Sequence, residues 1–219
     1  MKKALRYILN SIIIILSFLI YGVVQQFYIV PKSVPTSVIN QRAPWLLAAT
    51  LVVLMIYWWI YRLQLKVNNP NGYNQKPHFG WRRLGMSLLG FMLLLVWQVL
   101  AAILMKGQVS ANQTTIESII SNSNWLFNLM IALVAPIFEE IIFRGFVINT
   151  FFQGESKWNK VGAILVSGLI FGLMHEPKIS LYLLIYWGMG SILAAVYVYT
   201  KDLRYSMLVH ILNNSLSIL

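Results

Sequence analysis

The sequence contains no cysteine and only 6 acidic residues among 219. Without cysteine, the chain cannot form a disulfide, use a thiolate nucleophile or hold zinc through thiolates. Charged residues make up 11% of the chain, whereas a soluble domain usually carries about 25%. This scarcity of charge excludes an ordinary soluble globule, and the 58% content of hydrophobic residues excludes a disordered chain.

Long hydrophobic runs dominate the sequence, and the mean hydropathy is +0.69. Crossing a bilayer takes about 20 apolar residues. Seven apolar segments approach or reach that length: 7–24, 44–61, 84–105, 125–152, 161–175, 179–200 and 205–219. We expect the short fifth and seventh segments to be tilted, re-entrant or packed inside the bundle. The predicted fold class is therefore all-α, a polytopic membrane bundle of about seven transmembrane or membrane-embedded helices.

Basic residues far outnumber acidic ones, with 17 Lys and Arg and a net charge of +11. In a membrane protein such an excess belongs to the cytoplasmic loops, so we expect no nucleic-acid partner. If the N-terminus lies inside and the spans alternate, 12 of the 16 loop cations fall on the inner side. The sequence thus predicts a multi-pass protein of the plasma membrane with a cytoplasmic N-terminus. We expect the first segment to be an uncleaved anchor, since no small-residue cleavage site follows it.

Three charged residues interrupt the apolar fourth segment: Glu139, Glu140 and Arg144. Each charge near mid-span costs about 2.5–3.5 kcal/mol, so this helix inserts only marginally unless the charges find partners. Glu140 and Arg144 are four residues apart with the acid first, which favours an ion pair within the helix. Glu139 points about 100° away and is left free. Pro136 lacks a backbone donor and should open the helix ladder near Ala132.

Two later segments carry further polar side chains. The fifth segment should stop near His175, because Pro177 pushes the residue before it away from helix. In the seventh segment, His210 and Asn214 are four residues apart and share one face. A rise of about 1.5 Å per residue places Glu139, His175 and Asn214 at similar depth, with His210 one turn lower. We therefore expect these groups to converge inside the bundle.

The motif EExxxR at Glu139, FxxxH ending at His175 and HxxxN starting at His210 together resemble the CPBP family of intramembrane proteases. That family includes the CAAX prenyl endopeptidases and bacterial proteins linked to bacteriocin processing and self-immunity. The resemblance covers roughly residues 125–219. We therefore divide the chain into N-terminal transmembrane helices and loops at 1–124 and a CPBP-like catalytic core at 125–219. The polar stretch 64–79 should form an exposed connector within the first part.

The resemblance implies a set of six catalytic residues. They are Glu139, Glu140, Arg144, His175, His210 and Asn214. Glu139 would be the base that activates water, with His175 as its partner, while Glu140 and Arg144 would hold the geometry of the site. His210 and Asn214 would bind a metal or stabilise the oxyanion.

The sequence leaves open whether a zinc ion takes part in the reaction. Two histidines and a glutamate can form a catalytic zinc site with an open position, and Glu139, His175 and His210 are the candidate ligands. The HExxH spacing of many zinc proteases is absent, however. Glu176 is a further acid that has no place in the motif pattern.

The chemistry expected from the residues agrees with the resemblance. Peptide hydrolysis needs a base for water and donors for the oxyanion, and the chain offers neither Cys nor an evident Ser/His/Asp set. We expect a CAAX-protease-like membrane endopeptidase, metal-dependent or not, with a peptide or protein substrate at the bilayer. Its context would be bacteriocin or peptide processing, or self-immunity.

Three other interpretations fit parts of this pattern. The main alternative is a non-enzymatic bacteriocin immunity protein that acts on a membrane receptor. An ion or proton translocator would also place Glu, His and Arg in the membrane, but the sequence has no inverted repeat and no second acidic span. Finally, a Glu–Arg pair and a lone His in a span can simply hold helices together.

Overall fold

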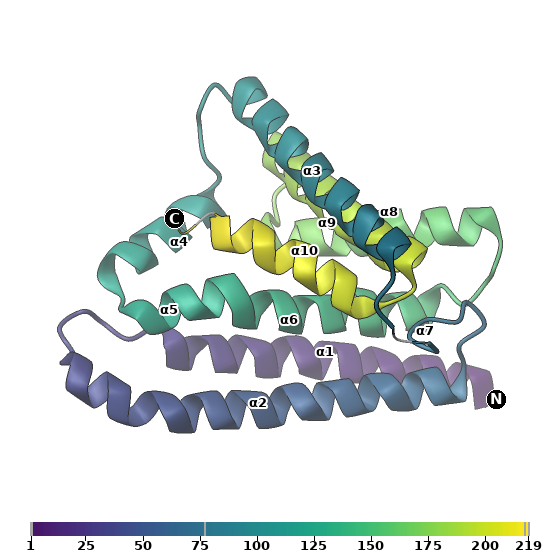
Figure 1. Ribbon diagram of the computed structural model, residues 1–219, viewed down its shortest axis with the longest axis horizontal. Helices are drawn as coiled ribbons and strands as arrows, with labels where there is room; N and C mark the ends of the chain where they lie inside the picture. The colour runs from purple at the N-terminus through teal and green to yellow at the C-terminus, as the bar shows by residue number, and fades with distance from the viewer. Residues whose placement is uncertain (1, 77, 217, 219) are drawn as a thin grey trace.

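The computed structural model describes residues 2–76, 78–216 and 218, and it is helical throughout its main elements (Figure 1). The side chains of Lys2 and Lys3, and residues 217 and 219 of the predicted seventh segment, lie outside the described part. In chain order the elements are α1 (Lys2–Tyr28), α2 (Thr36–Val67), α3 (Trp81–Leu104), α4 (Ala111–Asn122), α5 (Trp125–Leu129), η1 (Met130–Val134), α6 (Ala135–Glu140), η2 (Ile141–Ile148), α7 (Asn149–Phe151), α8 (Lys157–His175), α9 (Leu181–Thr200) and α10 (Leu203–Leu216).

Six helices in the described residues are long and apolar enough to cross a bilayer. One of them is continuous from α5 to α7 and spans Trp125–Phe151, and we name it the composite helix. With 14 residues, α10 is the short embedded segment that the sequence predicted. The predicted all-α polytopic bundle of about seven helices is confirmed.

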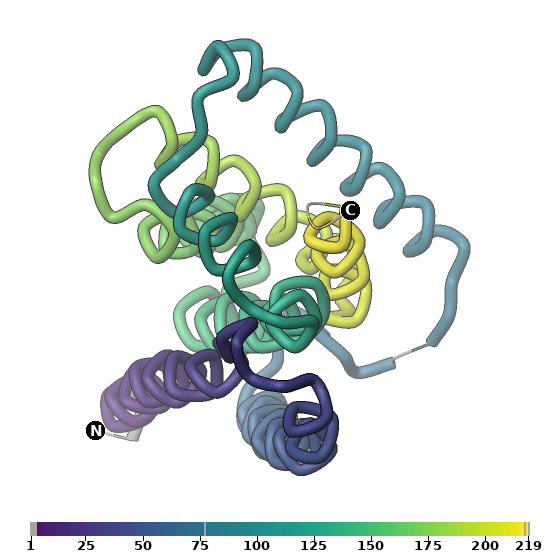
Figure 2. Tube along the Cα trace, turned by 90° about the vertical axis from the view of Figure 1, so that its left-hand side faces the viewer, coloured from purple at the N-terminus to yellow at the C-terminus, as the bar shows by residue number. Residues whose placement is uncertain are grey.

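The composite helix lies at the centre of the bundle (Figures 1 and 2). In its most apolar window 67% of the residues are buried, against 17–33% in the other five spans. Helices α1 and α2 pack against one side of it, whereas α8 and α10 contact other parts of its length. Helices α3 and α9 form an outer layer that packs on α8 and α10. The charged residues of the composite helix are therefore enclosed by protein.

Helices α8 and α9 approach one another closely through glycines. A Cβ atom on Gly190 would lie 2.9 Å from the carbonyl oxygen of Gly168, and one on Gly172 would lie 3.0 Å from the backbone nitrogen of Trp187. Both distances are too short for a larger residue, so these glycines permit the contact. The close packing brings the backbone of α9 within reach of the composite helix.

The connector between α2 and α3 is anchored in the bundle, and the prediction that it is exposed was wrong for residues 71–74. Tyr73 and Asn74 are 3% and 2% exposed. The Tyr73 ring stacks on Tyr197 at 4.5 Å, and the Asn74 N–H donates to the carbonyl of Lys201 at 2.8 Å. Tyr61 donates its hydroxyl to Asn74 Oδ1 at 2.7 Å. These polar groups are buried because partners inside the bundle satisfy them.

A buried carboxylate fixes the start of α10. Asp202 is fully buried and accepts hydrogen bonds from the backbone N–H of Arg204 at 3.2 Å and from its Nη2 at 2.7 Å, while Arg83 lies 3.4 Å away. Burial opposes the ionisation of Asp202, but the hydrogen bonds and charge of Arg204, aided by Arg83, outweigh it and lower the pKa of this carboxyl. The capped helix α10 then carries His210 and Asn214.

The polar stretch 107–124 contains helix α4, which the hydrophobic pattern did not predict. Ser110 begins the helix by accepting the N–H of Gln113 at 3.1 Å. The Ser110 hydroxyl also lies 2.8 Å from the hydroxyl of Tyr186 on α9. No residue of α4 is fully buried, so apolar periodicity gave no signal for it.

Candidate active site

The two glutamates lie in a short α-helical stretch between two π-helical segments of the composite helix. Segment η1 precedes α6 and segment η2 follows it. π-Helical turns are rare and are frequently found at functional sites. Glu139 and Glu140 end α6, with exposures of 8% and 0%. The irregular helix thus presents two adjacent carboxylates to different neighbours inside the bundle.

Glu140 and Arg144 form the predicted ion pair. Glu140 Oε1 lies 3.0 Å from Arg144 Nη1, and both side chains are fully buried. Arg144 Nη2 donates a second bond, at 2.7 Å, to the carbonyl oxygen of Gly190. The guanidinium also lies over the ring of Phe171, 5.1 Å from its centroid. Arg144 therefore joins the composite helix to both α8 and α9.

His210 of α10 contacts both carboxylates. Its Nδ1 is 3.0 Å from Glu140 Oε1, and its Nε2 is 3.7 Å from Glu139 Oε2. Glu140 is ionised beside Arg144 and can only accept, so His210 Nδ1 carries a hydrogen and donates it. The ion pair thereby holds the imidazole with its Nε2 turned toward Glu139.

His175, the last residue of α8, approaches Glu139 from another direction. Its Nε2 lies 4.0 Å from Glu139 Oε2, and its Nδ1 is 2.9 Å from the carbonyl oxygen of Phe171. A carbonyl oxygen only accepts, so this Nδ1 also carries the hydrogen. The ring is stacked between Phe171 at 4.2 Å and Tyr186 at 5.1 Å. The helix ends at His175, as Pro177 predicted.

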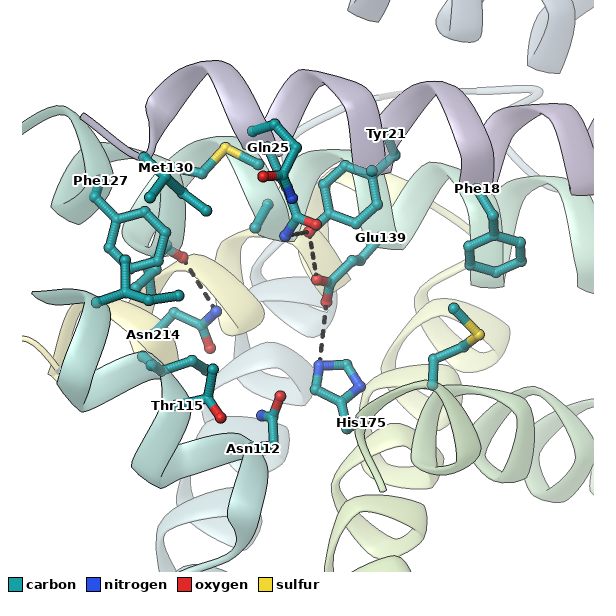
Figure 3. Close-up of a pocket in the computed structure, with 18 of the residues that line it drawn as sticks. Phe18, Tyr21, Gln25, Asn112, Thr115, Phe127, Met130, Glu139, His175 and Asn214 are labelled. Carbon is teal, nitrogen blue, oxygen red and sulfur yellow. Dashed lines mark hydrogen bonds and ion pairs between the residues drawn. The ribbon is translucent and has the colours of Figure 1, made fainter. Parts of the chain in front are cut away.

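Glu139 has a partner that the sequence analysis missed. Tyr21 of α1 donates its hydroxyl to Glu139 Oε1 at 2.7 Å, and Gln25 Nε2 donates to the Tyr21 oxygen at 3.0 Å (Figure 3). The prediction that Glu139 is left free was therefore wrong for one oxygen. The other oxygen, Oε2, is buried without a hydrogen bond from the described residues. The sequence signal that could have indicated this partner is the i, i+4 spacing of Tyr21 and Gln25 in an apolar span.

Asn214 is tied to the irregular backbone of η1. The N–H of Ala135 pairs with the carbonyl of Met130, five residues back. In that register the carbonyl of Ile131 would pair with Pro136, which has no N–H. Asn214 Nδ2 donates to this carbonyl at 3.2 Å instead. The predicted break in the ladder is present, but it falls at Ile131 rather than Ala132 because the turn is π-helical.

A cavity of about 400 Å³ lies beside these groups (Figure 3). It is lined by three of the predicted catalytic residues, from three different helices, namely Glu139, His175 and Asn214. Its further lining comes from α1 and the residue after it, from α4, from the composite helix and from α8: Phe18, Tyr21, Gly22, Gln25, Gln26, Ile29, Asn112, Thr115, Ile116, Ile119, Phe127, Met130, Ile131, Ala135, Phe143 and Met174. The cavity thus draws on both predicted parts of the chain.

Three lone pairs face one gap between Glu139, His175 and His210. With Nδ1 protonated on both neutral rings, each Nε2 has only a lone pair to offer, as has Glu139 Oε2. Such a set calls for hydrogen-bond donors, a proton on an imidazole, or a metal ion. The outward bonds of both Nδ1 atoms, to a carboxylate and to a carbonyl, are those that metal-binding histidines usually make.

The spacing of these atoms is wider than that of a closed zinc site. Tetrahedral ligands about 2.0–2.1 Å from zinc lie about 3.3 Å from one another, whereas the two measured separations are 3.7 and 4.0 Å. Accordingly, no group of three or more His, Cys, Asp or Glu in the described residues meets the geometry of a preformed metal site. The donor set suits zinc, but it would have to contract around Glu139 Oε2 to reach ligand spacing.

Two other polar residues of the sequence lie outside this set. Glu176 is 7% exposed and ends α8, where its N–H donates to the carbonyl of Gly172 at 2.8 Å. It does not line the cavity. His78 is exposed in the connector between α2 and α3, with its Nδ1 2.7 Å from the carbonyl oxygen of Lys76.

Comparison with known proteins identifies the region that holds the site. Residues 121–216 match the family described as type II CAAX prenyl endopeptidase Rce1-like. These residues are therefore similar to CAAX proteases. The predicted resemblance is confirmed, and the six candidate spans support an integral membrane protein.

Two curated bacterial proteins are similar to the chain over most of its length. The membrane-embedded CAAX protease MroQ of Staphylococcus aureus (strain USA300) is 29% identical over 188 residues, which cover 80% of this chain and 70% of that protein. The putative membrane peptidase YdiL of Bacillus subtilis (strain 168) is 28% identical over 184 residues, covering 82% and 72%. No solved structure gives a significant match. Both alignments are longer than the family region, so the similarity extends into the N-terminal helices.

Proposed function

We propose that this protein is a membrane endopeptidase in which Glu139 activates a water molecule for attack on a peptide bond. The observation that carries the proposal is the position of Glu139 Oε2, which faces two imidazoles beside a cavity of about 400 Å³. Placing a carboxylate in a membrane-spanning helix costs free energy, so we expect this side chain to have a functional role. A peptide substrate at the bilayer fits the family that the region matches.

In this mechanism Glu139 Oε2 takes one proton from water while the water oxygen bonds to the carbonyl carbon. The carbonyl electrons move onto its oxygen, and His210 in its protonated form, together with Asn214, stabilises the resulting charge. Collapse of this intermediate re-forms the carbonyl and breaks the C–N bond. The proton held by Glu139 passes to the departing amine. His175 orients the water from the other side of the gap.

The ion pair of Glu140 and Arg144 acts through His210. Arg144 keeps Glu140 ionised, and Glu140 holds the Nδ1 hydrogen of His210. The imidazole can therefore neither rotate away nor present the other nitrogen to Glu139. We assign Glu140 and Arg144 to positioning, and His210 to contact with the reacting atoms.

A zinc ion is an alternative occupant of the gap. Glu139 Oε2, His175 Nε2 and His210 Nε2 would hold it, and the bound ion would polarise the substrate carbonyl and acidify water. Glu140 and the Phe171 carbonyl would then orient the two imidazoles from behind. The positions of these supporting groups are the same with or without the metal.

We propose that the substrate is an internal peptide segment. Among the described residues, the cavity lining contains neutral amides and apolar side chains, with Glu139 as its only carboxylate and no Lys or Arg. A site that captures a free C-terminal carboxylate usually provides a cation or a nest of backbone donors. A secreted bacteriocin-like peptide, processed or inactivated at the plasma membrane, is the context we propose. A gene for a small leader peptide beside this gene would support that context.

Mapping of new N-termini in native membrane vesicles tests the proposed activity. Vesicles containing the wild-type protein should produce N-termini that are missing with Glu139→Gln, which keeps the volume of the side chain but removes the base. Glu155→Gln changes an exposed acid in the loop before α8 and is the matched control. The proposal fails if Glu139→Gln vesicles yield the same N-termini, or if wild-type vesicles yield none. Protection by an inactive Glu139→Gln protein would instead support a non-enzymatic immunity function.

The cytoplasmic N-terminus is a separate proposal that the absence of cysteine makes simple to test. Single cysteines can be added to the natural sequence without removing any others. A cysteine at an exposed position of the connector between α2 and α3 should react only with a membrane-permeant reagent in intact cells. Reaction with an impermeant reagent would show that the connector is extracellular and would contradict the proposed orientation.

A further inference from the structure

We propose that Tyr21 of α1 is a positioning residue that determines which oxygen of Glu139 acts as the base. This inference rests on the proposed function. Tyr21 lies outside residues 121–216, the region that matches the protease family. Neither the motif pattern nor that match assigns it a role, and the site in the C-terminal region is incomplete without it.

The direction of the hydrogen bonds is fixed by their donors. Gln25 Nε2 lies 3.0 Å from the Tyr21 oxygen, and an amide nitrogen only donates. The phenol oxygen accepts that hydrogen bond and gives its own hydrogen to Glu139 Oε1 at 2.7 Å. Gln25 is one helical turn beyond Tyr21, so both members of this relay belong to α1. An ionised carboxylate is the natural acceptor at its end.

The Tyr21 ring is held in place by the residue next to the base. It stacks on Phe138 with a centroid distance of 5.3 Å and an interplanar angle of 27°. Phe138 in turn meets Tyr57 of α2 edge-on at 5.2 Å. Tyr21 is 8% exposed, so neither its ring nor its hydroxyl is a mobile surface group. The hydroxyl therefore approaches Glu139 in one orientation.

The hydrogen bond from Tyr21 gives the two carboxylate oxygens of Glu139 different roles. The last torsion of a glutamate side chain is broad and two-fold, so the backbone alone does not set it. Tyr21 holds Oε1, and this leaves Oε2 directed at His210 and His175 at 3.7 and 4.0 Å. Loss of the phenol hydroxyl would let the carboxylate rotate away from the water that it must deprotonate. Misplacement of a reacting group by about 1 Å can cost roughly 10² in rate.

Another tyrosine on the same helix supplies a matched control. Tyr28 is fully buried, and its hydroxyl lies 2.8 Å from Thr50 Oγ1. It does not line the cavity. Tyr21→Phe and Tyr28→Phe each remove one buried phenol hydroxyl from α1, so their effects on folding should be similar. Only Tyr21→Phe removes a contact with Glu139.

Steady-state kinetics on a fluorogenic peptide, built on a cleavage site mapped with the wild-type protein, tests the inference. Tyr21→Phe should lower kcat by about tenfold to 100-fold, with KM changed by less than about twofold. Tyr28→Phe should keep wild-type kcat and KM.

The result that overturns the inference is an unchanged kcat in Tyr21→Phe, or an equal loss in Tyr28→Phe. If Tyr21→Phe does not accumulate, Gln25→Leu replaces it, since this change keeps the phenol and removes only its supporting donor. Gln25→Leu should lower kcat without raising KM, and an unchanged kcat there also overturns the inference. Loss of activity in Glu139→Gln with full activity in Tyr21→Phe would sink this inference alone, whereas activity in Glu139→Gln would sink the proposed function.

Discussion

Replacement of Arg144 by leucine should destabilise the protein far more than replacement of an exposed arginine. Arg144→Leu leaves the fully buried Glu140 without its ion pair, and the carbonyl of Gly190 without its donor. Breaking a buried pair costs about 3–5 kcal/mol, and the orphaned carbonyl adds about 1–3 kcal/mol. Native proteins are stable by only about 5–15 kcal/mol. We therefore expect little folded Arg144→Leu protein in the membrane.

The double substitution should recover much of that loss. Glu140→Gln removes the unpaired charge and still offers an oxygen to the Nδ1 hydrogen of His210, which the wild-type protein places 3.0 Å from Glu140 Oε1. What remains is the orphaned carbonyl of Gly190, about 1–3 kcal/mol. The double variant should therefore be about 3–5 kcal/mol more stable than Arg144→Leu. Activity should not return, because His210 is no longer held by a charged partner.

The assay combines two measurements on the single and double variants. The first is the amount of full-length protein in isolated membranes, and the second is the free energy of unfolding in detergent. Arg82→Leu, an exposed arginine at the start of α3, is the control and should stay close to wild type. The reasoning is refuted if the double variant is no more abundant or stable than Arg144→Leu. It is also refuted if Arg144→Leu behaves like Arg82→Leu.

Three further outcomes are expected. The pKa of Asp202 is lowered in the folded state, so its stabilisation is present above the ordinary carboxyl pKa and is lost as the pH falls through the lowered value. The unfolding temperature of the wild-type protein should therefore fall below about pH 4, and that of Asp202→Asn should fall much less. Equal acid sensitivity of the two proteins would contradict this. Pro136→Ala supplies an N–H for the carbonyl of Ile131 and should release Asn214, so kcat should drop several-fold in a stable protein; unchanged kcat would count against a role for Asn214. If zinc occupies the gap, a strong chelator should abolish activity and His210→Ala should lower bound zinc in elemental analysis; if a protonated imidazole serves there, neither treatment should alter metal content.

The sequence predicted the spans and the polar groups of the site because both depend on local patterns. Seven apolar segments indicated the bundle, and the spacing of Glu140 and Arg144 indicated an ion pair that the structure contains. Similar depth of Glu139, His175 and Asn214 along separate spans, with His210 one turn lower, indicated that these groups converge. The imidazoles of His175 and His210 lie within 4.0 Å of Glu139, and Asn214 lines the same cavity as Glu139. These relations require only helix geometry.

What the sequence did not predict depends on contacts between distant segments. Tyr21 looked like an ordinary aromatic residue of an anchor helix until the fold placed it 2.7 Å from Glu139, 118 residues later. Asn74 looked like part of an exposed turn, yet its side chain satisfies Tyr61 inside the bundle. Helix α4 has no buried face to give it an apolar period. The positions of such polar groups depend on partners in distant segments, and a local sequence pattern does not reveal those partners.

The most direct test of the account is the kcat/KM of the purified Glu139→Gln protein in proteoliposomes, measured on the mapped peptide beside wild type and Glu155→Gln. A general base contributes about 10²–10⁴ to the rate. We expect kcat/KM to fall toward the upper end of that range in Glu139→Gln, with a normal amount of folded protein in the vesicles and no change in Glu155→Gln. A folded Glu139→Gln protein with kcat/KM within about threefold of wild type would contradict the assignment of Glu139 as the base.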